Sequence, residues 1–514
     1  MIAWCPELLY TEGSFQNGAA VVCDESGAIV SIARVDELTD EKRISLPRRA
    51  MLPGMVNAHS HAFQRVIRGR TEYRTAPSFS GGLPPVGSGL HQKDSFWTWR
   101  EMMYSAATRL TPEDIYDASR MAFLEMALSG ITAVGEFHYL HHAPDGQPYD
   151  DPNLLAKEVI RAANDVGLRI ALLRVAYARS GFKAEPNPRQ ARFIEDETTI
   201  YLKNLEALAE SVRSPSVSEG ASVSDDKSTP EACVPSNNAW VGVAPHSVRA
   251  VPLDYLKQVI AYANENDFKV HMHVAEQPAE VSACVEEYGR TPFALLETEG
   301  LLSDRFTAVH AIHVTPKSIP GFAQTGAAVC ACPTTERNLG DGVVPADEYL
   351  EHGVPVCLGT DSHAQIDLLE DARELEYHLR LRKLERAVLI GNPTVREGAS
   401  ATRTDPSTLP HGRVSDIADL LFDCATLNGA RSIGAPNGAL AAGKPADFFT
   451  VDLDDPAIAG SSEGDLLASI VFASSRAAVR EVVVAGKPIA SEGQHLIQEE
   501  VIERFAELQK KLWA

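Results

Sequence analysis

The sequence predicts an α/β fold: a TIM-like (β/α)8 barrel with a small β-sandwich domain formed from both chain ends. Between about residue 52 and residue 430, short apolar runs typical of buried strands alternate with longer helical patterns. This order is expected of parallel strands covered by helices. At both ends the pattern changes to short β segments. The length of 514 residues also exceeds one ordinary hydrophobic core, so a large domain and a smaller one are expected.

Eight apolar runs are the expected barrel strands, because each has the short, apolar character of a strand buried in a parallel sheet. The clearest helical patterns cover residues 112–130 and 369–386. In such a barrel, side chains at the carboxyl ends of the strands converge on the active site. The expected strands lie within residues 50–61, 131–139, 169–177, 239–247, 269–276, 306–314, 327–333 and 355–363.

The terminal β segments predict the smaller domain. A hairpin is expected around Asp24–Gly27, and strand patterns return at 443–455 and 479–490. Segments from opposite ends of the chain can pair only if they meet in space. We therefore expect a β-sandwich domain over residues 1–51 plus 431–492, a barrel over 52–430, and an amphipathic C-terminal helix over 493–514 that packs on the barrel.

Three segments do not fit a compact barrel. Residues 213–238 and 391–413 are poor in large apolar side chains and rich in small, polar and proline residues. We expect both to be mobile surface insertions without a catalytic role. Residues 75–92 are rich in Gly and Pro and follow the first histidine motif closely. This segment is expected to be either a lid over the site or a long loop.

Composition narrows the class of protein. The formal net charge is −23, which disfavours nucleic acid or an anionic membrane as a partner. An anionic substrate would need local arginines. The sequence shows no secretory signal or transmembrane run, and its eight cysteines are scattered, so we expect a cytoplasmic protein with reduced thiols. Cys330 and Cys332 lie close together in the sequence, but a metal site built on these two cysteines would lack a second pair of ligands.

Histidines gather at the expected strand ends. His59 and His61 have strand spacing, so both side chains point to one face. An isolated pair of this kind is more often a hydrogen-bonded structural pair. Here further candidates follow other strands, namely His271, His273, Glu276, His310, His313, Asp361 and His363. Three imidazoles and a carboxylate suit a zinc ion with one position open to water, whose pKa such an ion lowers to about 7.

These motifs resemble a known family. The HxH after "PGM", the later "HVAE", a further histidine and "GTDSH" resemble the amidohydrolase superfamily of (β/α)8 metallohydrolases, and "GALAAGKPADFFTVD" resembles its C-terminal return strand. The resemblance covers nearly the whole chain. The segments "NAHSHAFQR", "FWTWREMMY", "GEFHYLHH", "HSVRAV", "HVAEQPAEV" and "TERNLGDG" more closely resemble the formimidoylglutamate deiminases within that superfamily.

The resemblance implies a reaction: hydrolytic deamination of N-formimidoyl-L-glutamate to N-formyl-L-glutamate and ammonia in histidine degradation, with metal-activated water attacking the formimidoyl carbon. It implies one Zn2+ per chain, or another divalent ion in its place, and a homodimer that acts on a small dicarboxylate. No lysine that could bridge two metals occurs in 239–247, which favours a single ion.

The resemblance also implies roles for particular residues. The implied metal ligands are His59, His61, His273 and Asp361. Glu276 would carry the proton and His310 would orient or polarise, with Asp361 as the third catalytic residue. The implied substrate contacts are Gln64, Arg100, Tyr139, His246 and Arg249, because guanidinium groups bind carboxylates in bidentate fashion.

Alternatives remain at this point. The same metal frame would serve a purine or pterin deaminase or a related aminohydrolase, and a metal-free binding protein could keep the fold. Glu276 could instead be a carboxylate that orients His273. Arg100 could be a surface arginine beside a helix, and Arg249 could form an ion pair at a helix start.

Overall fold

The barrel predicted from the strand pattern is present. The computed structural model describes residues 1–72, 96–213, 238–389 and 416–513. Eight strands form one parallel sheet in chain order, and an isolated bridge joins Ser60 of the first strand to Asp361, which lies just after the last strand. The strands are β6 (Met55–Ser60), β7 (Ile131–His138), β8 (Arg169–Ala176), β9 (Ala239–Pro245), β10 (Val270–Val274), β11 (Phe306–His310), β12 (Ala328–Ala331) and β13 (Val356–Leu358).

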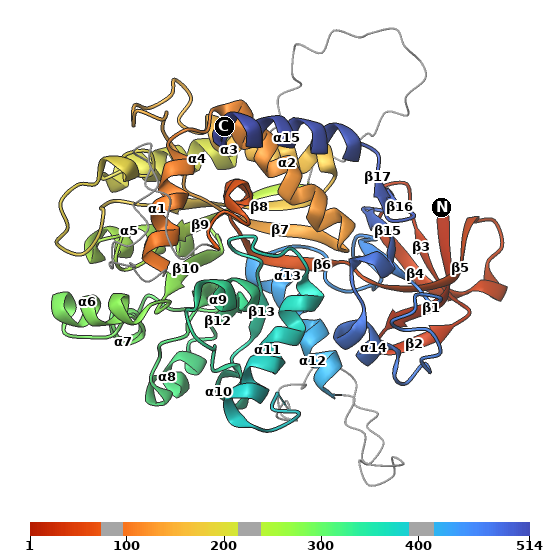
Figure 1. Ribbon diagram of the computed structural model, residues 1–514. Helices are drawn as coiled ribbons and strands as arrows, with labels where there is room; N and C mark the ends of the chain where they lie inside the picture. Colours follow the sequence, from red (N-terminus) through yellow and green to blue (C-terminus); the bar gives the residue numbers. More distant parts are fainter. Residues whose placement is uncertain (73–95, 214–237, 390–415, 514) are drawn as a thin grey trace, which may run out of the picture.

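Helices surround this barrel (Figure 1). The predicted helix at 112–130 is α2, which begins after a capping box in which Thr111 and Asp114 satisfy each other's backbone N–H groups. The helices are α1 (Phe96–Ala107), α2 (Pro112–Leu128), α3 (Leu154–Val166), α4 (Thr198–Arg213), α5 (Leu253–Glu265), α6 (Pro278–Tyr288), α7 (Pro292–Thr298), α8 (Ile319–Gln324), α9 (Pro333–Leu339), α10 (Ala346–Glu351), α11 (Leu368–Lys383), α12 (Asp416–Ala425), α13 (Leu427–Ile433), α14 (Leu466–Ala473) and α15 (Gln498–Trp513).

The two chain ends meet in a separate mixed sheet, seen in Figure 1 where the red and blue ends of the chain lie together. Its nine strands follow the order β17-β16-β15-β14-β5-β1-β3-β4, with β2 paired to β1. The junction is β5, which runs parallel to β1 and antiparallel to β14. The strands are β1 (Ile2–Thr11), β2 (Ser14–Asn17), β3 (Ala19–Cys23), β4 (Ile29–Arg34), β5 (Lys42–Pro53), β14 (Phe448–Asp452), β15 (Val479–Val484), β16 (Lys487–Ser491) and β17 (Gln494–His495).

This sheet confirms that both ends build one β unit, and β3 and β4 form the expected hairpin. Successive side chains of its strands point to opposite faces of the sheet, and both faces are apolar. Trp4, Val21 and Phe448 belong to one buried apolar cluster, and Ala3 and Val22 belong to another. The domain limits given above stay a prediction.

The C-terminal helix α15 packs along α2 (Figure 1). Its apolar side includes Phe505 and Leu508. At the rim of this contact Arg120 binds Glu500 at 2.8 Å and Arg504 binds Asp117 at 2.8 Å.

Other sequence expectations meet the structure only in part. Residues 75–92 and 391–413, and all but the ends of 213–238, lie outside the described residues. The seven cysteines within the described ranges form no disulfide. None of the helices in those ranges is long and apolar enough to cross a lipid bilayer.

Candidate active site

The predicted metal-binding and catalytic side chains lie at the carboxyl ends of the barrel strands. His59 and His273 lie within β6 and β10, and His310 ends β11. The backbone there is unusual, because His310, Asp361 and Ala275 all adopt positive φ angles, of 67°, 47° and 54°. Left-handed conformations of residues other than glycine cost free energy and gather at functional sites, where the surrounding structure enforces them.

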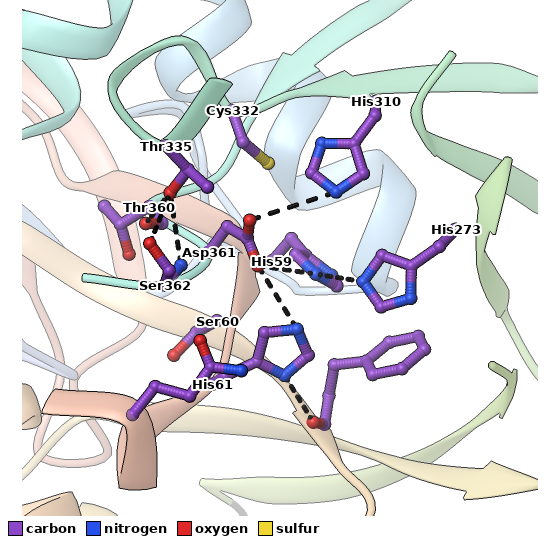
Figure 2. Close-up of polar contacts among 12 residues, drawn as sticks. His59, Ser60, His61, His273, His310, Cys332, Thr335, Thr360, Asp361 and Ser362 are labelled. Atoms are coloured by element: carbon purple, nitrogen blue, oxygen red, sulfur yellow. Dashed lines mark hydrogen bonds and ion pairs between the residues drawn. The ribbon is translucent and has the colours of Figure 1, made fainter. Parts of the chain in front are cut away.

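The structure brings the four predicted metal ligands together, as Figure 2 shows. His59, His61, His273 and Asp361 are all buried, and one ligand atom of each lies within 4.8 Å of the others. The Nε2 atoms of His59 and His273 are 3.1 Å apart. Asp361 Oδ1 lies 3.5 Å from His59 Nε2 and 3.2 Å from His61 Nε2. Donors about 2.0–2.1 Å from a shared tetrahedral zinc ion would lie roughly 3.3 Å apart, so this spacing fits such an ion.

Backbone carbonyls fix how two of these imidazoles face. His61 Nδ1 lies 2.9 Å from the Phe137 carbonyl oxygen, and His273 Nδ1 lies 3.1 Å from that of His246. Since a carbonyl only accepts, each Nδ1 carries the hydrogen and each Nε2 presents its lone pair to the centre. Burial lowers the pKa of His59 to about 3 and that of His273 well below its usual value. Both are therefore neutral, the state that metal ligation requires.

Asp361 supplies the negative charge. Burial alone would raise its pKa, but the contacts with His59 and His61 hold the pKa of this carboxyl well below its usual value. One ionised carboxylate and three imidazoles are a donor set that zinc accepts.

Glu276 and His310 lie beside this group. His310 Nε2 is 3.7 Å from Glu276 Oε1 and 3.9 Å from Asp361 Oδ2. Its Nδ1 is 3.3 Å from Oε1 of Glu336, a buried carboxylate at the start of α9. Although burial opposes a charged imidazole, Glu276, Glu336 and Asp361 raise the pKa of His310 to about 10. Burial raises the pKa of Glu276. The pair is thus placed to hold and pass a proton next to the centre.

Other histidines in the same sequence clusters point elsewhere. His271 Nε2 lies 3.0 Å from the Ser432 carbonyl oxygen and His313 Nε2 lies 2.8 Å from that of Asp341. His363 contacts Ser60 Oγ and Thr360 Oγ1, each at 3.1 Å. His271 lies on the same face of β10 as His273 but two residues further from the carboxyl end of the strand, so it lies deeper in the barrel than the metal group.

Sequence reasoning missed a supporting carboxylate on β7. Glu136 accepts hydrogen bonds from the Ser60 hydroxyl at 2.5 Å and from the Ala62 N–H at 2.7 Å. It therefore holds the residues on either side of His61. Burial raises the pKa of Glu136 to about 7. Its only signal in the sequence was its place in the "GEFHYLHH" segment.

A pocket opens from the metal group, and all five predicted substrate contacts line it: Gln64, Arg100, Tyr139, His246 and Arg249. Gln64 Nε2 donates to Tyr139 Oη at 2.8 Å. The Gln64 Oε1, Arg100 Nε and Arg249 Nη1 atoms are buried without a hydrogen-bond partner in the described part of the chain. Buried polar atoms normally have partners, so these three indicate where a polar ligand binds.

Aromatic side chains form the remaining wall, which sequence reasoning did not anticipate. Tyr104, Tyr177 and Phe193 line the pocket, and Gln190 donates from its Nε2 to Tyr104 Oη at 2.9 Å. The Arg100 guanidinium lies 4.4 Å from the ring centroid of Trp97, which holds it by a cation–π contact. Burial and the neighbouring Arg249 lower the pKa of Arg100.

Comparisons with known proteins agree with this geometry. The model of the amidohydrolase family matches residues 50–489. The chain is 37% identical to formimidoylglutamate deiminase of Pseudomonas aeruginosa, over 89% of this chain and 88% of that protein. It is 25% identical to 5-methylthioadenosine/S-adenosylhomocysteine deaminase of Pyrococcus abyssi, over 95% of this chain and 94% of that one.

Solved structures share the whole fold. An amidohydrolase from Brucella melitensis superimposes with a TM-score of 0.81 at 31% identity, covering 100% of both chains. An adenosine deaminase from Xanthomonas campestris, solved with bound zinc, gives a TM-score of 0.74 at 21% identity over 99% of this chain and 98% of that one. With the family model spanning most of the sequence and a relative aligned over most of both chains, this protein belongs to the amidohydrolase family.

Proposed function

We propose that this protein hydrolyses N-formimidoyl-L-glutamate to N-formyl-L-glutamate and ammonia, a step of histidine degradation. One observation carries the proposal: two guanidinium groups with buried nitrogens that lack a partner in the described residues, on Arg100 and Arg249, line the same pocket as three of the four predicted metal ligands. A dicarboxylate with a reactive amidine needs both features at once. The 37% identity to the Pseudomonas aeruginosa deiminase over 89% of the chain supports the same substrate.

We assign one zinc ion to His59, His61, His273 and Asp361, whose donor atoms are three imidazole nitrogens and one carboxylate oxygen. When bound, such an ion acidifies water and polarises the group under attack. Two of these ligands are already held in orientation, since backbone carbonyls accept hydrogen bonds from the Nδ1 atoms of His61 and His273.

The pocket residues would bind the two carboxylates of the substrate. Arg100 and Arg249 have unsatisfied N–H groups there, and a carboxylate accepts from such a fork in bidentate fashion. Gln64, Tyr139 and His246 complete the polar contacts of the glutamate part. The formimidoyl carbon then lies towards Glu276 and Asp361, at the metal end of the pocket.

Proton transfer falls to the residues beside the metal group. Water adds to the formimidoyl carbon, and Asp361 accepts the proton that the water loses. Glu276 passes this proton, and then the one left on the newly added oxygen, to the departing nitrogen. The C–N bond breaks as the C=O bond forms, and ammonia leaves. His310 stabilises the charge that develops on oxygen. General acid–base catalysis of this kind contributes about 10²–10⁴-fold.

Ammonia release tests the proposal. The purified protein is assayed with N-formimidoyl-L-glutamate, and in parallel with 5′-methylthioadenosine, adenosine and guanine. We expect turnover of the formimidoyl substrate and little from the bases, because two unpartnered guanidinium groups suit an anion rather than a neutral purine. Ammonia released only from the bases would show that this is another deaminase of the same family. The homodimer and the cytoplasmic location stay predictions; light scattering tests the first.

A further inference from the structure

A second group of metal-binding side chains adjoins the first. His310, Cys332 and Asp361 are buried, and one donor atom of each lies within 4.8 Å of the others. They come from the ends of three neighbouring strands, β11, β12 and β13. In Figure 2 the Cys332 sulfur and the His310 ring lie on the side of Asp361 opposite to His61. Cys332 thus has metal-binding neighbours that its spacing from Cys330 in the sequence does not reveal.

Asp361 presents a different oxygen to each group. Its Oδ1 lies 3.2 Å from His61 Nε2, whereas its Oδ2 lies 3.9 Å from His310 Nε2. A carboxylate arranged in this way can bind one cation with each oxygen, as in sites that hold two metals about 3.5–4 Å apart. The His310 imidazole is already oriented for ligation, because Glu336 binds its Nδ1 at 3.3 Å.

The surroundings of His310 carry more negative than positive charge. Glu276 Oε1 lies 3.7 Å from its Nε2, Glu336 lies on its other side, and Asp361 adjoins it. Asp341 is 3% exposed and has an Oδ2 atom without a hydrogen-bond partner in the described residues. Four carboxyl groups therefore lie around His310, and a buried cation is stabilised by such partners.

We propose that His310, Cys332 and Asp361 form a second, weaker site for a thiophilic divalent cation such as Cd2+ or excess Zn2+. A thiolate favours soft and borderline cations, and on binding the Cys332 thiol and the Nε2 of the His310 imidazolium each release one proton to the solvent. A cation in this site also takes the Nε2 lone pair of His310 and lies against Glu276. Given the function proposed above, occupancy of the second site would block proton transfer and inhibit the enzyme.

Cadmium binding tests the site without relying on turnover. The full-length protein is first loaded with one equivalent of Zn2+, verified by elemental analysis, and then titrated with Cd2+. The ultraviolet charge-transfer absorption of a cadmium–thiolate bond reports the bound sulfur, and equilibrium dialysis gives the number of cations per chain. Cys332→Ser and Cys332→Ala remove the sulfur. Cys424→Ser, a buried cysteine of α12, is the matched control.

We expect wild type and Cys424→Ser to hold one zinc and one cadmium and to develop the absorption. Both Cys332 variants should keep one zinc but lose the absorption and bind the second cation at least about tenfold more weakly. In turnover assays they should need about tenfold more Cd2+ for half-inhibition. Wild type that holds one cation only, or a Cys332 variant that keeps the absorption, would overturn the proposal. Neither result depends on which substrate the enzyme uses.

Discussion

Replacing Arg249 with methionine tests how the pocket holds its substrate. The side chain lines the pocket, and its Nη1 is buried without a hydrogen-bond partner in the described residues. A hydrogen bond to a charged group contributes about 1.5–3 kcal/mol, and about 1.4 kcal/mol is a factor of ten. We therefore expect kcat/KM for N-formimidoyl-L-glutamate to fall roughly 10- to 150-fold. The melting temperature should not fall, because methionine removes an unsatisfied polar atom and keeps much of the packing volume.

The assay compares substrates that lack one carboxylate. N-formimidoyl-4-aminobutyrate has no α-carboxylate, and N-formimidoyl-2-aminobutyrate has no side-chain carboxylate. Each arginine is expected to bind one of the two carboxylates. Arg249→Met should therefore not lower kcat/KM for the analogue that lacks the carboxylate bound by Arg249, and Arg100→Met should not lower kcat/KM for the other analogue. Arg249→Lys keeps the charge but not the fork, so its loss should be intermediate. Arg34→Met, on the exposed edge of the terminal sheet, is the control.

Wild-type kcat/KM for Arg249→Met on the full substrate would refute this reasoning. Equal losses on both analogues would also refute it, because they would show that Arg249 acts on the fold of the pocket instead of on one carboxylate.

Three further predictions follow from the geometry. Glu276→Gln should keep its metal by elemental analysis but lose about 10²–10⁴-fold in kcat; near-normal turnover would mean that another group moves the proton. Removing the metal with a chelator should lower the melting temperature, and adding Zn2+ back should restore it, because an ion that binds only the folded state stabilises it; an unchanged transition would show that no structural ion was removed. Although burial raises it, His141 and Arg174 lower the pKa of Glu195 to about 2. A carboxyl whose pKa is lower in the folded than in the unfolded state stabilises the fold at pH values above its unfolded pKa of about 4.3. This stabilisation is lost as the pH falls towards 2. In denaturant titrations the stability of Glu195→Gln should therefore change less over this range; the wild-type slope would contradict the assignment.

Much of the fold could be read from the sequence, because burial on both faces makes barrel strands apolar along their whole length. The runs at 131–139 and 169–177 are β7 and β8 with both faces buried. The strand period of two also brought His59 and His61 to one face. The pairing of β5 with β14 could be anticipated only as a meeting of the chain ends, because register depends on contacts between distant segments.

The supporting residues of the site could not be predicted. Glu136 reaches Ser60 across 76 residues of sequence, and Glu336 reaches His310 across 26. No local pattern encodes such contacts. The same holds for Cys332, whose possible co-ligands His310 and Asp361 lie at the end of β11 and just after β13. Sequence patterns thus identify residues that carry their own chemistry, whereas residues that orient them become visible only once the strands are assembled.

The most direct test of the account is kcat on N-formimidoyl-L-glutamate as a function of bound metal, both measured on one sample of purified protein. Activity should rise with metal content and reach its maximum at one ion per chain. Equal turnover by metal-free protein, or one tightly held ion with no turnover of this substrate, would contradict the account.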